Sequence, residues 1–191
     1  DLQRPLYLLQ TERGVAAWPL QEAKGSEQTS LPLLGVLPAL EPQHLGDPAF
    51  GATYGVRYAY YAGAMANGIA SAKLVIALGQ RGILASFGAA GLLPSRIEAA
   101  LQQMQQALPR GNFACNLIHS PSEEALERGA VELYLRYGVR CLEASAFLDL
   151  TPHIVRYRVA GLENTPQGIV ARNRVIAKVS RTEVARRFLD P

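Results

Sequence analysis

Cysteine is scarce in this sequence, and so are long apolar runs. Only two cysteines occur among 191 residues, Cys115 and Cys141, and each stands inside an apolar segment. Free buried thiols are typical of a reducing compartment, so we expect a cytoplasmic location. No apolar run reaches the roughly 18 residues that a membrane-crossing helix needs. The sequence therefore predicts a protein with neither a disulfide framework nor a membrane span.

An excess of charge of one sign is also missing. The chain has 19 Lys and Arg against 16 Asp and Glu, a net charge of +3. Its densest basic stretch, residues 172–187, is interrupted by Glu183 and suits the exposed face of a helix. Affinity for nucleic acid rests on several clustered phosphate contacts, so we expect no nucleic-acid partner. With 49% hydrophobic and 18% charged residues, the composition instead indicates a globular chain with a substantial core.

Common motifs of nucleotide, nucleophile and metal chemistry are absent. The sequence has no GxGxxG spacing after a strand-like segment, no Walker loop, no nucleophile elbow and no HExxH. Cys115 and His119 are spaced as ligands can be, but two groups do not make a zinc site. We expect no metal site. His119 should instead pack or hydrogen-bond near the start of a helix, and His153 should lie in the first turn of another.

Residues 1–50 differ in composition from residues 51–191, and we expect two regions with this boundary. In the first, apolar segments at 7–10 and 15–18 flank a turn that ends in Gly14, which predicts a β-hairpin. Prolines interrupt helices and most strands, so the remainder is expected to be an irregular, non-helical extension. The prolines concerned are Pro32, Pro38, Pro42 and Pro48.

From about residue 57, a strand-then-helix unit repeats. Five strands are expected, at 58–62, 83–88, 113–118, 139–145 and 175–180. Their runs are apolar without clean alternation, as in parallel strands that are buried on both faces. Two folds accept this α/β pattern, an open doubly wound sheet or a (β/α)8 barrel of the TIM type. A barrel needs about three more units than the five found here, so it would be incomplete.

Local signals predict where the helices between these strands begin and end. Serine followed three residues later by glutamate has the spacing of a capping box, and it occurs at Ser95 and Glu98, Ser120 and Glu123, and Ser180 and Glu183. Proline is tolerated at the first helical position, to which we assign Pro121 and Pro152. Glycine favours left-handed helix ends, which we assign to Gly82, Gly138 and Gly161.

Polar side chains interrupt three successive strands near their carboxyl ends. They are Asn116 in the third, Glu143 and Ser145 in the fourth, and Lys178 in the fifth. Ligands collect at this end of the sheet in both candidate folds. A buried carboxylate or ammonium is costly alone, and neighbouring strands are close enough for Glu143 and Lys178 to neutralise each other. The cluster is therefore either a buried ion pair without a ligand or the polar floor of a binding site. We prefer the second interpretation, the polar floor of a binding site.

Stretches of small residues follow the first two strands, at 62–68 and 87–91. Missing side chains let a planar ligand or a phosphate approach the backbone, although glycine also serves tight turns. These stretches contain Gly63, Ala64, Met65, Asn67 and Gly88, which we take as candidate cofactor-binding residues.

Several longer motifs resemble those of one family. They are GVLPAL at 35–40, LGD at 45–47, AGAMANGIA at 62–70, FGAAGL at 87–92, NLIHSP at 116–121, EASAF at 143–147 and IAKVS at 176–180. In this order they resemble the PfaD family of flavin-dependent enoyl reductases, which serve polyunsaturated fatty-acid synthases and trans-acyltransferase polyketide synthases. These enzymes are relatives of the nitronate monooxygenases.

The resemblance implies a (β/α)8 barrel that holds FMN at its carboxyl face. Gly63, Ala64 and Met65 would lie along the isoalloxazine, Asn116 and Lys178 would contact the flavin, and Glu143 would line its pocket. NADPH would reduce the flavin, which would pass hydride to the β-carbon of an enoyl thioester on an acyl carrier protein. The protein would position the cofactor and tune its electronics.

The sequence departs from the family pattern because it stops at residue 191. The histidine of the expected Gly-Gly-His segment, the candidate acid/base, and the later phosphate-binding loops are not in it. We therefore expect the chain alone to be inactive until a complementary C-terminal barrel fragment or a continuation completes it. Open sheet edges would also invite association with another copy. A nitronate monooxygenase-like flavin oxidase and a non-catalytic docking fragment of a synthase are the competing hypotheses.

Overall fold

The computed structural model describes residues 3–19 and 31–190. The chain divides into two compact units, Asp1–Pro48 and Ala49–Pro191, and each is described by itself. Among the described residues, no helix is long and apolar enough to cross a membrane.

The described part of the first unit contains a small antiparallel sheet with the strand order β2-β1-β3. Its strands are β1 (Leu6–Thr11), β2 (Gly14–Pro19) and β3 (Leu33–Leu37). The predicted hairpin is confirmed. It turns at Gly14, whose φ of +116° few other residues adopt, and the Thr11 hydroxyl donates to the Gly14 carbonyl at 2.7 Å.

The expectation of an irregular, non-helical segment after the hairpin was wrong in two ways. Residues 33–37 form β3, which Pro32 and Pro38 flank from outside, so the strand loses no ladder hydrogen bond to them. Pro42 and Pro48 are the first residues of the 3-10 helix η1 (Pro42–His44) and of α1 (Pro48–Tyr54). A proline at a helix start gives up an amide hydrogen that has no partner in the helix anyway.

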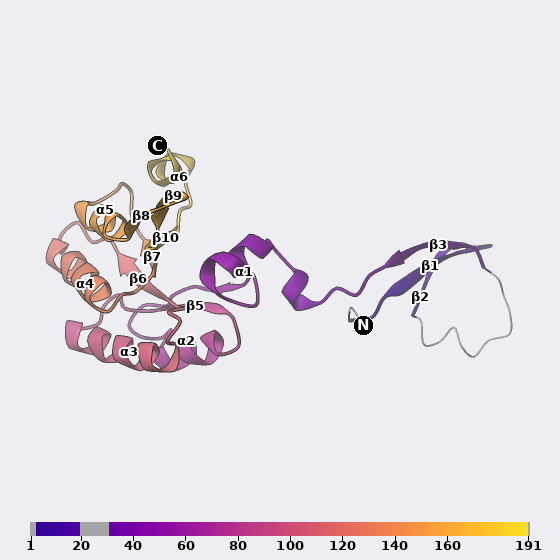
Figure 1. Ribbon diagram of the computed structural model, residues 1–191, viewed down its shortest axis with the longest axis horizontal. Coiled ribbons are helices and arrows are strands. Elements are labelled where there is room, and N and C mark those ends of the chain that lie inside the picture. The colour runs from indigo at the N-terminus through magenta and orange to yellow at the C-terminus, as the bar shows by residue number, and fades with distance from the viewer. Residues whose placement is uncertain (1–2, 20–30, 191) are drawn as a thin grey trace. The chain divides into compact units, whose positions relative to one another are not determined.

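The second unit contains a parallel sheet in which the described residues supply five strands, in the order β10-β7-β6-β5-β4. The strands are β4 (Tyr61–Ala62), β5 (Leu84–Phe87), β6 (Ala114–Ile118), β7 (Cys141–Ser145) and β10 (Arg174–Ala177). The predicted α/β architecture is confirmed as an incomplete (β/α)8 barrel, a half-barrel whose successive units lie side by side (Figure 1).

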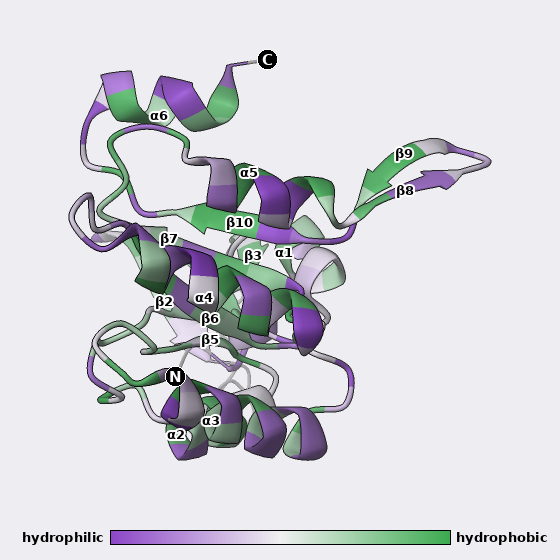
Figure 2. Ribbon diagram, turned by 90° about the vertical axis from the view of Figure 1, so that its left-hand side faces the viewer, coloured by the Kyte–Doolittle hydropathy of each residue, from purple (hydrophilic) through white to green (hydrophobic). Residues whose placement is uncertain are grey.

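Helices follow the strands and cover one face of this sheet. They are α2 (Ala72–Gly79), α3 (Pro94–Ala107), α4 (Glu124–Arg136), α5 (Pro152–Val159) and α6 (Thr182–Leu189). Figure 2 shows most of them banded in hydrophilic and hydrophobic colours, as amphipathic helices on a sheet must be. Their apolar side chains form the core together with alternate strand residues, among them Phe87, Cys115, Leu117 and Leu142.

The other residues of the strands point to the opposite face. The pairing register aligns Asn116 with Glu143, and Glu143 with Ile176 of β10. Ser86 lies on the same face of β5, two residues before Gly88, which is level with Asn116. Each strand therefore alternates between an apolar contact with the helices and a side chain of this inner face. Burial on both faces hides that alternation in the sequence.

The helix starts differ from the predicted capping boxes. The helices begin at Pro94, Glu124 and Thr182, and none of the three predicted serines caps them. Ser120 instead donates to the Glu123 carboxylate at 3.3 Å, and Pro121 lies before α4 rather than in it. The assignment of Pro152 to a first helical position is confirmed, with the Thr151 hydroxyl accepting from the Ile154 amide at 3.4 Å. A three-residue spacing alone does not fix where the backbone turns helical.

Two of the three predicted left-handed glycines are confirmed, with φ of +77° at Gly82 and +58° at Gly138. Gly161 lies outside the left-handed region. Glycine is required there for another reason, because a Cβ would collide with Asn173. After it comes a hairpin that was not predicted, β8 (Leu162–Thr165) and β9 (Gly168–Ala171). Figure 2 shows it projecting away from the sheet, with a mostly hydrophilic β8 and a mostly hydrophobic β9.

Candidate functional site

Glu143 of β7 is the centre of a polar cluster on the inner face. Its side chain is 0% exposed, yet it is fully partnered. One carboxylate oxygen accepts from Lys178 Nζ at 3.1 Å, and the other accepts from the Ala64 amide at 2.9 Å and from the Tyr61 hydroxyl. The carboxylate thus joins the strands β4, β7 and the residue after β10.

The electrostatics of the cluster keep Glu143 ionised. Burial by itself would raise the pKa of Glu143, but hydrogen bonds from Tyr61, Ala64 and Lys178, with the charge of Lys178, hold that pKa below its ordinary value. Burial raises the pKa of Tyr61, its hydrogen bond to Glu143 raises it further, and Ser86 lowers it in part. At neutral pH Glu143 is therefore a carboxylate and Tyr61 a neutral phenol.

Lys178 is the part of this ion pair that meets solvent. Its side chain is 51% exposed, while Glu143 is completely covered. Glu143 consequently holds the ammonium group of Lys178 from the protein interior, while the other side of this group is open to solvent. Such an arrangement can present a fixed positive charge to a ligand at the carboxyl end of the sheet.

Asn116 and Ser145 extend the polar floor beside Glu143. The Asn116 amide donates to Ser145 Oγ at 2.8 Å and to the Glu143 carbonyl at 3.3 Å. Behind it, the Tyr134 hydroxyl donates to the Asn116 carbonyl at 2.6 Å, which fixes the backbone of β6. The structure thus brings Asn116 of β6, Glu143 of β7 and Lys178 together, as the sequence predicted, although Lys178 directly follows β10 instead of lying in it.

The loops after β4 and β5 lock onto one another beside this floor. The Gly88 amide donates to the Ala70 carbonyl at 2.9 Å, and a Cβ at Gly88 would collide with the Met65 carbonyl. Asn67 adopts a left-handed conformation with φ of +56°, and its amide donates to the Ala90 carbonyl at 2.7 Å. Gly88 and Asn67 therefore shape the loop that carries Gly63 and Ala64.

The candidate residues of these loops lie at different distances from the cluster. Ala64 bonds directly to Glu143, and Gly63 lies beside the same carboxylate, since a Cβ there would be 3.6 Å from it. Met65 is 46% exposed, and the Asn67 side chain faces Gly91 of the β5 loop. Gly63 and Ala64 border the floor, while Asn67 and Gly88 support it.

Sequence reasoning missed two residues of this site, Tyr61 and Ser86. Both lie on the inner face, in the same alternating set as Gly63 and Gly88. Ser86 is fully buried, and its hydroxyl makes no hydrogen bond of normal geometry with a described residue. Counting every second residue back from Gly63 and from Gly88 would have found both.

A second polar group lies on the helix side of β6. His119 Nδ1 contacts the buried Glu127 carboxylate at 2.9 Å, and the Thr151 hydroxyl donates to the other oxygen. The predicted role of His119 as a packing and hydrogen-bonding residue is confirmed, and its ring also lies 5.2 Å from that of Phe147. His153 lies in the first turn of α5, as predicted. Among the described residues, no three His, Cys, Asp or Glu side chains are grouped as a metal site.

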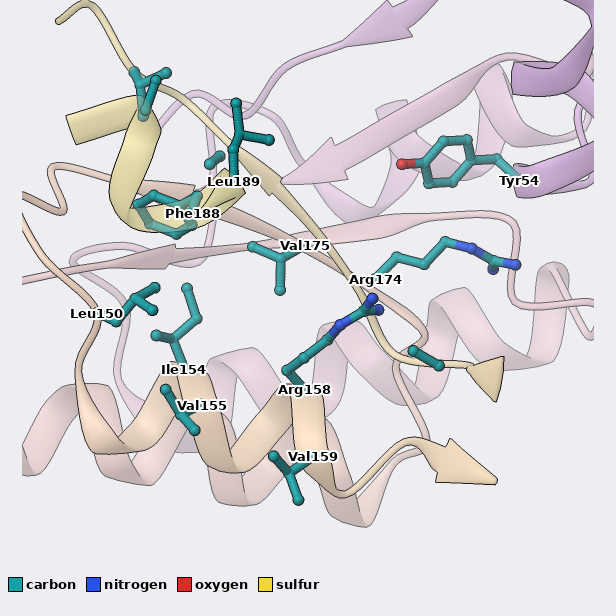
Figure 3. Close-up of a pocket in the computed structure, with 14 residues that line it drawn as sticks. Tyr54, Leu150, Ile154, Val155, Arg158, Val159, Arg174, Val175, Phe188 and Leu189 are labelled. Carbon is teal, nitrogen blue, oxygen red and sulfur yellow. The ribbon is translucent and has the colours of Figure 1, made fainter. Parts of the chain in front are cut away.

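Two cavities differ in their relation to this site. A groove of about 760 Å³ lies on the helix side of β10, where Val175 is at its floor and α5 and α6 form its walls (Figure 3). It faces away from Lys178 and Glu143. Another cavity, of about 590 Å³, lies at the carboxyl ends of β5 and β6 and includes Asn116. The second cavity therefore shares Asn116 with the polar floor, while most of its lining belongs to α3, α4 and the loops before them.

No family model matches the chain. One of the polyunsaturated fatty acid synthase subunits of Thraustochytrium sp. (strain ATCC 26185 / S-3) is 56% identical over 148 residues, which are 77% of this chain and 10% of that protein. The polyketide biosynthesis protein PksE of Bacillus subtilis (strain 168) is 40% identical over 151 residues, which are 78% of this chain and 20% of that protein. The chain thus spans a tenth to a fifth of the length of these relatives.

Two solved structures have the same fold. The enoyl reductase domain of MlnA, from the macrolactin biosynthesis cluster of Bacillus amyloliquefaciens, aligns with a TM-score of 0.76 at 40% identity and covers 79% of this chain and 35% of that one. FabK from Thermotoga maritima aligns with a TM-score of 0.58 at 19% identity and covers 72% of this chain and 39% of that one, which supports the fold alone. The chain is a partial homologue of the enoyl reductase domains of polyunsaturated fatty-acid and polyketide synthases.

Proposed function

We propose that this chain forms the flavin-binding part of an FMN-dependent, NADPH-driven, trans-acting enoyl reductase. Its substrates would be 2-enoyl thioesters on an acyl carrier protein, in cytoplasmic polyketide or polyunsaturated fatty-acid biosynthesis. The observation that carries the proposal is the inner-face cluster, in which a buried Glu143 fixes the exposed ammonium of Lys178 beside a glycine-lined loop. A protein that served only as a scaffold has no need for this ion pair.

The residues present fit a flavin. A flat ring needs a surface without protruding side chains, and Gly63 and Ala64 provide one at the edge of the floor. Its polar edge has both donors and acceptors, and the floor offers the ammonium of Lys178 as a donor and the side-chain carbonyl of Asn116 as an acceptor. The buried hydroxyl of Ser86, which lies next to the Tyr61 hydroxyl, is a further polar group on this side.

Each residue then has a separate task. Gly63, Ala64 and Met65 would lie along the ring, and Asn116 and Lys178 would bind its polar atoms. Glu143 would hold Lys178 and the Ala64 amide in place, while Asn67 and Gly88 keep the supporting loops closed. When bound, FMN would supply hydride transfer, with NADPH as the reductant.

We propose further that this half-barrel acts only when a continuation or a complementary C-terminal fragment completes the barrel. In the sheet of the described residues, β4 and β10 are both edge strands, so the inner face is open on two sides. Open water weakens every charge interaction on this face. The groove beside β10 also leaves apolar side chains uncovered, among them Val155, Val159 and Leu189 (Figure 3).

The test is anaerobic reduction of the full-length protein by NADPH, followed by addition of a crotonyl thioester of acyl carrier protein. The flavin absorbance near 450 nm should bleach with NADPH and return with the thioester. Return only with oxygen would assign a flavin oxidase instead. Absence of flavin absorbance, with retained binding of acyl carrier protein, would assign a docking role. The 191-residue chain tested alone should not oxidise NADPH.

A further inference from the structure

A cavity of about 590 Å³ lies between α3 and α4, at the carboxyl ends of β5 and β6. Its volume lies within the range of about 300 to 1,000 Å³ that is usual for small-ligand sites. The three residues that bond the Glu143 carboxylate, Tyr61, Ala64 and Lys178, do not line the cavity. The kind of ligand that this cavity can hold therefore follows from its own lining.

The lining favours a neutral, apolar ligand. One wall of the cavity includes Leu92, just before α3, and Ile97 in α3. The other wall includes Leu126 and Leu133 in α4. Among the described residues that line it there is no Lys or Arg, and its charged side chains are Glu123 and Glu127. A phosphate or a nucleotide would meet negative charge there without a counter-charge. A hydrocarbon chain would exchange water for apolar contacts.

A glycine in the middle of α4 keeps this space open. Gly129 lines the cavity, and a Cβ built on it meets no atom within 4 Å. Its φ lies outside the left-handed region, so neither backbone conformation nor packing requires glycine here. Glycine weakens a helix interior relative to alanine. Glycine at position 129 therefore leaves the cavity larger than any other residue would.

The cavity shares one residue of the polar floor, Asn116. Asn116 lines it and also donates to Ser145 on the inner face. His119 stands at the same end, with its ring held through Nδ1 by the buried Glu127. Asn116 and His119 thus form a polar part of the lining at the carboxyl end of β6, and the apolar part lies between the two helices.

We infer that this cavity accommodates the hydrocarbon chain of the carrier-bound acyl substrate and that Gly129 sets the chain length that fits. The inference rests on the proposed function for the identity of its ligand. It assigns a specificity-determining role to α3 and α4, outside the polar cluster. A side chain at position 129 should shorten the space without disturbing the flavin.

The test compares Gly129→Leu with Arg128→Leu in the full-length protein. Arg128 is the neighbouring, exposed residue of α4 and does not line the cavity, so this control adds the same leucine to the same helix. For Gly129→Leu, kcat/KM with a dodecenoyl thioester should fall at least tenfold, and with a crotonyl thioester it should stay within twofold. Arg128→Leu should change neither value. Equal effects of Gly129→Leu on both substrates would overturn the inference.

A binding measurement separates this inference from the proposed function. Calorimetric titration with dodecanoyl-pantetheine should give at least tenfold weaker binding to Gly129→Leu than to the wild type, whereas acetyl-pantetheine should not distinguish them. If this result appears without enoyl reduction, the cavity is confirmed and the reductase proposal fails. If reduction occurs and Gly129→Leu binds both thioesters as the wild type does, the cavity proposal fails alone. Gly129→Ala, the milder variant, should give the same direction of change.

Discussion

Replacing Tyr61 with phenylalanine would remove one hydrogen-bond donor from a carboxylate that has no access to water. The Tyr61 hydroxyl donates to the Glu143 oxygen that also accepts from the Ala64 amide. A hydrogen bond to a charged group contributes about 1.5 to 3 kcal/mol, and no water can replace the lost donor at a 0% exposed side chain. The loop that carries Ala64 should therefore open more easily.

Native-state hydrogen exchange measures this opening in a protein of any size. A loss of about 1.5 to 3 kcal/mol corresponds to a roughly 10- to 100-fold faster exchange of the Ala64 amide. Mass spectrometry of peptides that cover residues 61–66 would report it. Tyr60→Phe is the matched control, because Tyr60 is exposed and precedes Tyr61 in the chain. If both variants exchange at the same rate, Tyr61 does not secure Glu143 and the description of the cluster is wrong.

Further predictions concern charge, thiols and glycines. Because the folded-state pKa of Glu143 is lowered, its stabilisation is complete above the unfolded pKa of about 4.5 and is lost as the pH falls through the folded value. Urea unfolding at pH 3 to 6 should show this loss in the wild type and not in Glu143→Gln. Burial raises the pKa of Cys141 to about 12 and also raises that of Cys115, so neither thiol should react with a disulfide reagent at pH 8 before unfolding. In thermal unfolding, Gly88→Ala should lower the midpoint, because its Cβ would meet backbone, whereas Gly129→Ala should stabilise by up to about 1 kcal/mol. A lower midpoint for Gly129→Ala would show that the space beside α4 is filled.

The strands and the polar floor were predictable because each leaves a direct trace in the sequence. A strand buried on both faces has to be an apolar run, and β6 and β7 are such runs. Charged residues are costly in such runs unless partnered, so Glu143 and Lys178 stood out. Their pairing follows from strand adjacency alone.

Other features leave no such trace. Tyr61 is one of several tyrosines around β4, and only the strand register shows that it faces Glu143. The β8–β9 hairpin was missed because its strands are short, and the spacing of β7 and β10 still allows one helix between them. The start of α4 was misplaced because the side chains of Ser120 and Glu123 bond to each other and not to the backbone. Strand register, short hairpins and helix starts therefore depend on the folded backbone and not on local composition.

The central claim is that the inner face of this half-barrel binds flavin through Lys178. The most direct measurement is the dissociation constant of FMN from the flavin-free, full-length protein, by fluorescence quenching. Lys178→Met should weaken binding by about tenfold or more, because a charge-assisted bond contributes about 1.5 to 3 kcal/mol. Lys73→Met, the same change at an exposed residue of α2, should leave binding unchanged. Equal dissociation constants for the two variants would contradict the claim.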